Sequence, residues 1–179
     1  MIKRCLTTAM KLPFFHLLRE DNQVQDVIEV QTEDFNQGAL YDALRQDSLA
    51  NGAIVTFSGL VRDFNQGHKV GDLFLEHYPA MTKASLLNIV TAARARWHFG
   101  KIILIHRVGR LAQGEQIVFV GLTSAHRKDA FDGVQFIMDY LKTEAPFWKK
   151  ESTSEGDKWV AANVSDTQAR LRWDKQDEM

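Results

Sequence analysis

The stretch "MDYLKTEAPFWKKE" (residues 138–151) carries two lysines on either side of a proline. Lys142 and Lys149 are seven positions apart, so an uninterrupted helix would present both ammonium groups on one face. Pro146 lies between them, and the residue before a proline is pushed out of the helical region. The sequence therefore predicts that a helix ends just after Lys142 and that Lys149 follows on a separate element. The two aromatic residues between them are expected to anchor the bend against the core.

Apolar patterns along the rest of the chain predict an alternation of strands and helices. Strand-like runs occupy 26–30, 52–62, 73–78, 101–109 and 115–123, and helical spacing marks 35–47, 81–97 and 124 to about 143. A hairpin is expected where two further strand-like runs flank "TSEGD" (153–157). Paired strands with irregularly placed helices favour an α+β fold over a doubly wound parallel sheet.

Several local details of these elements are predicted as well. Ser124 can cap the third helix, whose expected buried stripe is Phe131, Val134, Met138 and Leu141. The run 52–62 is almost continuously apolar, which indicates that both of its faces are covered. The segment 63–72 reads as a loop, and 110–114 as a turn. Gly100 is expected to end the helix at 81–97.

The composition of the 179 residues is that of an ordinary globular protein. One domain is expected at 26–163, after a poorly ordered extension at 1–25 and before a polar tail at 164–179 that is either helical or frayed. A net charge of −1 gives no general attraction to nucleic acid or to an anionic membrane. The single cysteine excludes a disulfide framework, and no apolar run approaches the roughly 20 residues of a membrane span. A cytoplasmic protein is therefore expected.

Several cations lie where ligands commonly bind. In "TSAHR" (123–127), His126 and Arg127 fall at the start of a predicted helix, whose free N–H groups attract anions. Arg62 ends a strand and offers a rigid fork of donors to a carboxylate or phosphate. Each also has an ordinary structural explanation, such as a capping histidine, a surface ion pair or, for Lys142, a favourable position at a helix C-terminus. The residues alone predict only scattered cations that could form an anion pocket.

Motifs for other kinds of site are absent from the sequence. No two histidines have the i, i+4 spacing of helical metal ligands, so no metal site is expected. The sequence contains no Walker loop, no G-x-G-x-x-G and no G-x-S-x-G, so nucleotide binding and serine hydrolysis have no support.

Three stretches are informative when taken together: "TSAHR" (123–127), "FIMDYLKTEAPFWKKE" (136–151) and "EGDKWV" (155–160). In combination they resemble the large, catalytic subunit of molybdopterin synthase. "VTFSGLVRDFNQG" (55–67), "LEHYPAMTKASL" (75–86) and "IHRVGRLAQGEQIVFVGLTSAHR" (105–127) match the same family in the same order. The resemblance runs from about residue 26 to 162 and implies an α/β hammerhead fold.

The resemblance implies a specific activity. The large subunit would form a homodimer within a heterotetramer, with a small sulfur-carrier subunit at each end. The carrier's C-terminal Gly-Gly tail, activated as a thiocarboxylate, would enter a pocket of the large subunit. Sulfur would pass in two rounds to cyclic pyranopterin monophosphate and form the dithiolene of molybdopterin. No metal or other cofactor is implied for the large subunit.

The resemblance also implies which residues act. Lys142 and Lys149 look like the essential pair beside the carrier's tail. The substrate-binding wall would comprise Leu60, Val61, Arg62, His126, Arg127, Lys150 and Glu151. Leu60 departs from the lysine expected at its position, which weakens the site if that side chain contacts substrate.

Two other functions remain open at this stage. One is a non-catalytic adaptor that binds the carrier, although an adaptor would have no need of the pterin-binding residues. The other is a lysine Schiff-base enzyme acting on a phosphorylated carbonyl compound with the same cations.

Overall fold

The computed structural model describes residues 25–46, 49–62, 64–65, 68–153, 156–160 and 164–174. The strands are β1 (Val27–Gln31), β2 (Ala53–Leu60), β3 (Phe64–Asn65), β4 (His68–His77), β5 (Phe99–Arg107), β6 (Gly109–Ala112), β7 (Gln116–Ser124), β8 (Phe147–Thr153) and β9 (Gly156–Trp159). The helices are α1 (Gln37–Arg45), α2 (Pro79–Arg96), α3 (Arg127–Glu144) and α4 (Val164–Asp174). The predicted poorly ordered extension lies, up to residue 24, outside the described residues.

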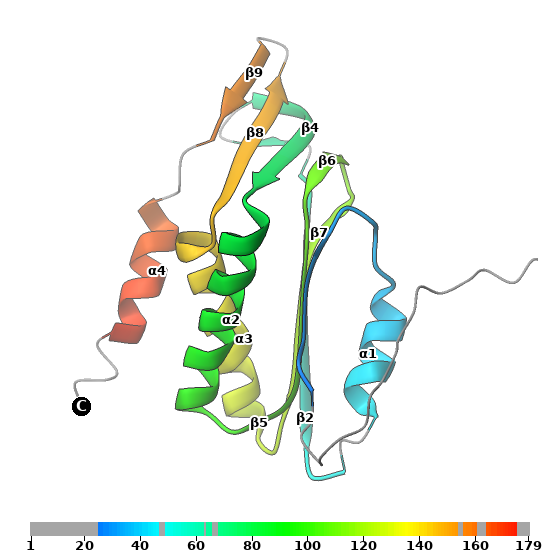
Figure 1. The fold of residues 1–179 in the computed structure, drawn as a ribbon, viewed down its shortest axis with the longest axis vertical. Coiled ribbons are helices and arrows are strands. Elements are labelled where there is room, and N and C mark those ends of the chain that lie inside the picture. Colours follow the sequence, from blue (N-terminus) through cyan, green and yellow to red (C-terminus); the bar gives the residue numbers. More distant parts are fainter. Residues whose placement is uncertain are drawn as a thin grey trace, which may run out of the picture.

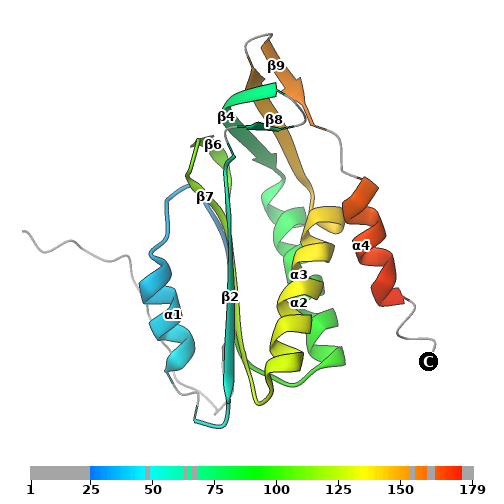
Figure 2. The same cartoon turned by 180° about the vertical axis from the view of Figure 1, so that it is seen from behind.

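The strands form two sheets. The first has the order β1-β5-β7-β2, and the second has the order β3-β4-β8-β9 with β6 paired to β4. Figure 1 shows α2 and α3 on one face of the first sheet, α1 on the other, and the second sheet at the upper end. The view from behind in Figure 2 shows the same layers. This mixed architecture confirms the predicted α+β class.

Two apolar clusters hold the helices on the first sheet. Alternate residues of β5 and β7 point to opposite faces, so each strand supplies both clusters. On the α2 and α3 side, the fully buried residues include Leu86, Ile102 and Phe136. On the α1 side, Leu44 packs against Phe119 and its neighbours. The almost continuous apolar runs of β5 and β7 are explained by this coverage on two faces.

The predicted bend between the two lysines is confirmed. α3 ends at Glu144, and the next residue, Ala145, is extended with ψ 128°. β8 then starts at Phe147, directly after Pro146. Lys149 therefore lies on a strand rather than on the helix that carries Lys142.

The second sheet contains one predicted hairpin and two elements that the sequence analysis missed. β8 and β9 pair antiparallel around the expected turn. The predicted loop at 63–72 is wrong, because β4 already begins at His68 and pairs with β3. The predicted turn at 110–114 contains most of β6, which pairs with β4. Gly109 has φ +86°, which favours glycine, at the corner where the chain passes from β5 to β6.

Several predicted details near the helices are wrong. Ser124 is the last residue of β7, and its hydroxyl donates to the carbonyl of His98, so His126 is the N-cap of α3 instead. Phe131, which was expected in the buried stripe, is 63% exposed. Gly100 lies inside β5, and α2 ends before it at Arg96. At Ser124 and Gly100, pairing between strands distant in sequence overrides a local signal.

β2 is less covered than its apolar sequence indicated. It is an edge strand of the first sheet, and none of its residues is fully buried. Phe57 is 40% exposed and Leu60 is 51% exposed. The expectation that both faces of 52–62 are covered is therefore wrong.

α4 occupies part of the segment expected to be a polar tail. Its Trp173 is buried in the main apolar cluster, and the Trp173 indole and the Arg172 guanidinium both donate to Asp139 of α3, at 2.8 Å and 2.7 Å. The helical alternative for this segment is the one observed. None of the helices that the structure describes combines the length and the apolar composition of a membrane span.

The close packing of α3 on the first sheet can be tested at Gly133. A Cβ at this position would collide with the ring of Phe99. We expect Gly133→Ala to lower the free energy of unfolding by about 1–3 kcal/mol, because the core must shift to accept the methyl group. Urea denaturation would measure the change. Gln135→Ala, on the exposed side of the same helix, is the control and should leave stability almost unchanged.

Candidate functional site

The site begins at the C-terminal end of α3, where Lys142 lies in the last turn. A cation is favoured there by the helix dipole. The Lys142 Nζ lies 3.1 Å from a carboxylate oxygen of Asp166 in α4, and its side chain is 51% exposed. The docked helix α4 thus supplies a negative partner to the lysine without covering it.

Lys149 follows on β8, and it too has a carboxylate partner. Its Nζ lies 2.5 Å from Glu151, the neighbouring residue on the same face of the strand. Glu151 is 7% exposed and lies opposite the buried Leu73 on β4. Both lysines are therefore held by carboxylates of this chain, each from a different element.

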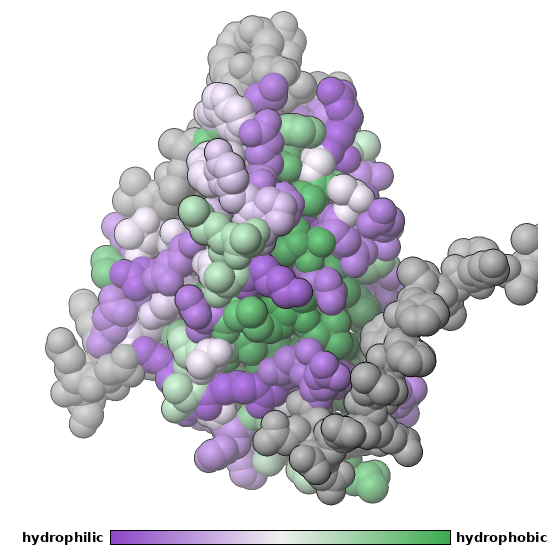
Figure 3. Space-filling model, viewed as in Figure 1, coloured by the Kyte–Doolittle hydropathy of each residue, from purple (hydrophilic) through white to green (hydrophobic). Residues whose placement is uncertain are grey.

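Lys150 points to the other face of the second sheet. Its Nζ lies 6.0 Å from the ring centre of Phe74 and 5.8 Å from that of Trp159. These rings, with Tyr78 and Trp148, line a groove of about 670 Å³ on the outer face. Figure 3 shows pale side chains of intermediate hydropathy over this part of the molecule. The side chain of Lys150 therefore does not converge with those of Lys149 and Glu151.

The end of β2 brings Arg62 to the same end of the molecule as α3's last turn. Val61 is 5% exposed and packs in a small cluster with Leu73 and Leu111. The Val61 N–H donates to the Glu115 carbonyl at 2.9 Å, and the Val61 carbonyl accepts from Gly114 at 2.8 Å. This anchoring fixes the backbone on which the exposed Arg62 stands.

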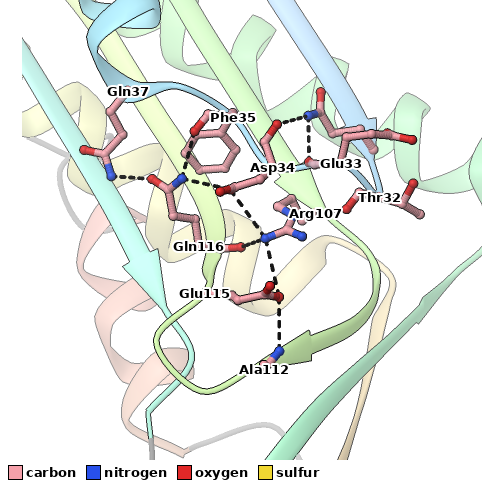
Figure 4. A network of polar contacts seen from close by, with 10 residues as sticks. Thr32, Glu33, Asp34, Phe35, Gln37, Arg107, Ala112, Glu115 and Gln116 are labelled. Atoms are coloured by element: carbon pink, nitrogen blue, oxygen red, sulfur yellow. Dashed lines mark hydrogen bonds and ion pairs between the residues drawn. The ribbon is translucent and has the colours of Figure 1, made fainter.

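A buried arginine supports the turn that holds Val61. Arg107 is 6% exposed, and Figure 4 shows its guanidinium between Asp34 and Glu115, at 3.4 Å and 3.7 Å. It also donates to the carbonyls of Thr32 and Gln116. A buried guanidinium needs such partners, and these four groups satisfy it. The network ties the connection after β1 to the β6–β7 turn.

At the start of β8, the Phe147 ring packs against two histidine rings from other strands. The Phe147 ring stacks on His106 of β5, with ring centres 3.8 Å apart, and its cross-strand neighbour His77 of β4 lies at 6.3 Å. His106 is 5% exposed, and its Nδ1–H donates to the Arg107 carbonyl at 2.8 Å. Burial is the main cause that lowers the pKa of His106 to about 4; the hydrogen bond to the Arg107 carbonyl opposes this shift, and the nearby His77 adds to it.

His126 and Arg127 lie at the opposite end of the molecule from the lysines. They begin α3, whereas Lys142 is in its last turn, and 18 helical residues span about 27 Å. β2 runs in the same direction as α3, because its first residue, Ala53, pairs with Ser124 and its last, Leu60, with Gln116. Figure 1 shows the start of α3 at the bottom and its end beside β8. One copy of the chain does not bring the two groups together.

Sequence reasoning missed the partners of the predicted residues. Asp166 is 24 positions from Lys142, and the rings that flank Phe147 belong to two other strands. The opposite orientations of Lys149 and Lys150 on β8 could have been predicted from the sequence, because successive residues of a strand point to opposite faces of the sheet. Among the described residues, no group of three His, Cys, Asp or Glu side chains could hold a metal ion.

Comparison with known proteins agrees with this arrangement of elements. A family model described as "MoaE protein" matches residues 30–144. The chain belongs to the MoaE family. The molybdopterin synthase catalytic subunits of Pseudomonas aeruginosa and Escherichia coli are 51% and 54% identical to it over 148 and 146 residues. These alignments cover 83% and 82% of this chain, and 99% and 97% of the two relatives.

Solved structures of MoaE-family proteins share the fold. A MoaE protein from Burkholderia ambifaria is 45% identical with a TM-score of 0.71, and the match covers 83% of this chain and 98% of that one. Molybdopterin synthase from Staphylococcus aureus is 28% identical with a TM-score of 0.69, covering 75% and 96%. The resemblance seen in the sequence is thereby confirmed, and the relatives carry the name molybdopterin synthase catalytic subunit.

The buried histidine beside Phe147 predicts a pH dependence of stability. In the unfolded chain His106 takes up a proton near pH 6.5, whereas in the folded chain it does so only near pH 4. The unfolded state therefore binds more protons between these values, and stability falls as pH drops through this window, by up to about 3 kcal/mol.

Denaturant titrations of wild type and His106→Phe at pH 7, 5.5 and 4.5 would measure this contribution. The variant should lose less stability than wild type over the same range. Equal losses in both proteins would show that other groups cause the acid sensitivity.

Proposed function

We propose that this MoaE-family chain is the catalytic subunit of a molybdopterin synthase. It would transfer sulfur from the thiocarboxylated C-terminus of a small carrier subunit to cyclic pyranopterin monophosphate. The observation that supports this most is the bend at Pro146, which delivers Lys142 and Lys149 to one end of the molecule from two different elements. Relatives about half identical to this chain over nearly their whole length bear the same subunit name.

In this proposal the two lysines serve the tail of the carrier and the protons of the reaction. The tail is anionic before transfer, as a thiocarboxylate, and after it, as a carboxylate. Charge-assisted hydrogen bonds to such groups contribute about 1.5–3 kcal/mol each. Asp166 and Glu151 hold the ammonium groups in place, and the incoming anion shares or replaces these contacts.

Arg62, His126 and Arg127 are proposed to bind the phosphate and the pterin. Because His126 and Arg127 lie about one helix length from Lys142, we propose that a site combines residues of two copies of the chain. The half-exposed edge strand β2, with Phe57 and Leu60 on its surface, leaves an apolar face open for the second copy. A twofold axis across β2 would set the Leu60 end of one copy beside the Ala53 end of the other.

The catalytic assignment can be tested at Lys142. Lys142→Ala should lower product formation at least about 100-fold, because a preorganised cation is removed from the reacting groups. The assay would combine the purified chain, thiocarboxylated carrier and cyclic pyranopterin monophosphate, and would measure molybdopterin. Lys83→Ala, an exposed lysine on α2, is the control and should retain wild-type activity. Normal turnover by Lys142→Ala would contradict the assignment.

The two-copy site can be tested by mixing inactive variants. Lys142→Ala and Arg127→Ala chains would be unfolded together, refolded in equal amounts and assayed. If each site takes Lys142 from one copy and Arg127 from the other, half of the dimers are mixed and each has one intact site. Activity should then recover to about a quarter of wild type. No recovery, with mixed dimers confirmed by mass spectrometry, would place both residues in one copy's site.

A further inference from the structure

Phe147 is the residue through which the bend after α3 is fixed to both sheets. Its ring lies nearly parallel to that of His106, with an interplanar angle of 13° and ring centres 3.8 Å apart. The ring of His77 flanks it at 6.3 Å and 25°. His106 belongs to the first sheet and His77 to the second, so the three rings, here named the ring clamp, join the two sheets.

The bend itself has little backbone hydrogen bonding and is held mainly by the packing of Ala145 and Phe147 against the main apolar cluster. Pro146 has no N–H to donate, and the Phe147 N–H donates back to the Ala145 carbonyl at 2.8 Å. The strand ladder begins only at Phe147, which pairs with His77 on β4. The direction in which β8 leaves the bend is therefore set by its pairing with β4 together with the packing of the Phe147 ring at its first residue.

Lys149 depends directly on this direction. Phe147 and Lys149 are two residues apart on one face of β8, which places their Cα atoms about 6–7 Å from each other. Lys149 pairs with Leu75, and the register between these residues and the clamp is continuous. A displacement of Phe147 that shifts the first residues of β8 would therefore move the Lys149 ammonium relative to Lys142.

The two histidines carry a cost that plain apolar residues would avoid. His77 Nδ1 is buried and has no hydrogen-bond partner among the described residues. His106 is nine-tenths buried and anchored through Nδ1–H to the backbone of the next residue, Arg107. An unpaired buried polar atom lowers stability, because its hydrogen bond to water is lost without replacement. The anchored His106 ring, by contrast, has a fixed orientation against which Phe147 can stack.

From this geometry we propose that His106 is a positioning residue for sulfur transfer. It acts through Phe147, and the ring clamp sets the place of Lys149 beside Lys142. The inference rests on the proposed function for its kinetic consequence, but its structural content is independent of that function. It assigns a role to the ring of His106, and none to its titration.

Two substitutions separate the ring from the hydrogen bond. His106→Phe keeps a flat ring for stacking and loses the donor, whereas His106→Gln keeps a donor and loses the ring. Ile102→Val, in the same strand and in the core, is a control for general destabilisation, because it removes one buried methyl group. All three proteins would be assayed for kcat, for KM of the thiocarboxylated carrier and for thermal stability.

The proposal predicts a defined pattern among these variants. His106→Gln should lower kcat at least about 10-fold, since small misplacements of reacting groups have large effects on rate. His106→Phe should stay within about 3-fold of wild type, and Ile102→Val should keep wild-type kcat despite its lower stability. Equal kcat for His106→Gln and wild type, or equal losses in His106→Gln and His106→Phe, would overturn the proposal.

Hydrogen exchange provides a readout that does not need turnover. Backbone amides of 147–151 should exchange faster in His106→Gln than in wild type or His106→Phe, while those of β7 stay protected. If wild type itself makes no molybdopterin, the proposed function fails but this exchange pattern still tests the clamp. Unchanged exchange at 147–151 in His106→Gln would contradict the clamp whatever the activity.

Discussion

The restriction that a proline places on the preceding residue is the constraint on which the rest of this structure depends. Because Pro146 forbids a further helical turn, α3 stops two residues after Lys142 and the chain continues as β8. β8 then becomes a central strand of the second sheet, with β4 on one side and β9 on the other. Without the break, the second sheet would lose the strand that joins its parts, and Lys149 would be carried along the helix.

Three cations near this break each have a carboxylate partner within the chain. Lys142 is paired with Asp166 of α4, Lys149 with Glu151, and the buried Arg107 with Asp34 and Glu115. The first two pairs stand at the proposed reaction centre, where an incoming anion can compete for the ammonium groups. The third group, around Arg107, holds the turn to which the backbone before Arg62 is bonded. Its role is structural, because four partners enclose the Arg107 guanidinium.

The sequence predicted those features that follow from local chemistry. The end of α3 followed from Pro146, and the β8–β9 hairpin from the turn residues between two strand-like runs. The failures arose where distant pairing decides. Ser124 was predicted as a helix cap, but its pairing with Ala53 and Phe99 keeps it in β7.

β6 was hidden in a segment with turn-like composition, because only its pairing with β4 makes it a strand. The partners Asp166 and His106 could not be predicted for the same reason. The family resemblance named the candidate residues, but it did not reveal that His126 and Arg127 stand at the far end of α3.

Because of that separation, the length of α3 determines a distance within the proposed dimer. In the proposed dimer, one end of the helix serves one site and the other end serves the second, so its length fixes how the two sites are spaced. Inserting or deleting a single residue would shift one end by about 1.5 Å and turn it by about 100°. We therefore expect insertions and deletions between Arg127 and Lys142 to be tolerated far less than substitutions. Exposed positions such as Gln135 can change their residue type, whereas the number of residues must stay the same.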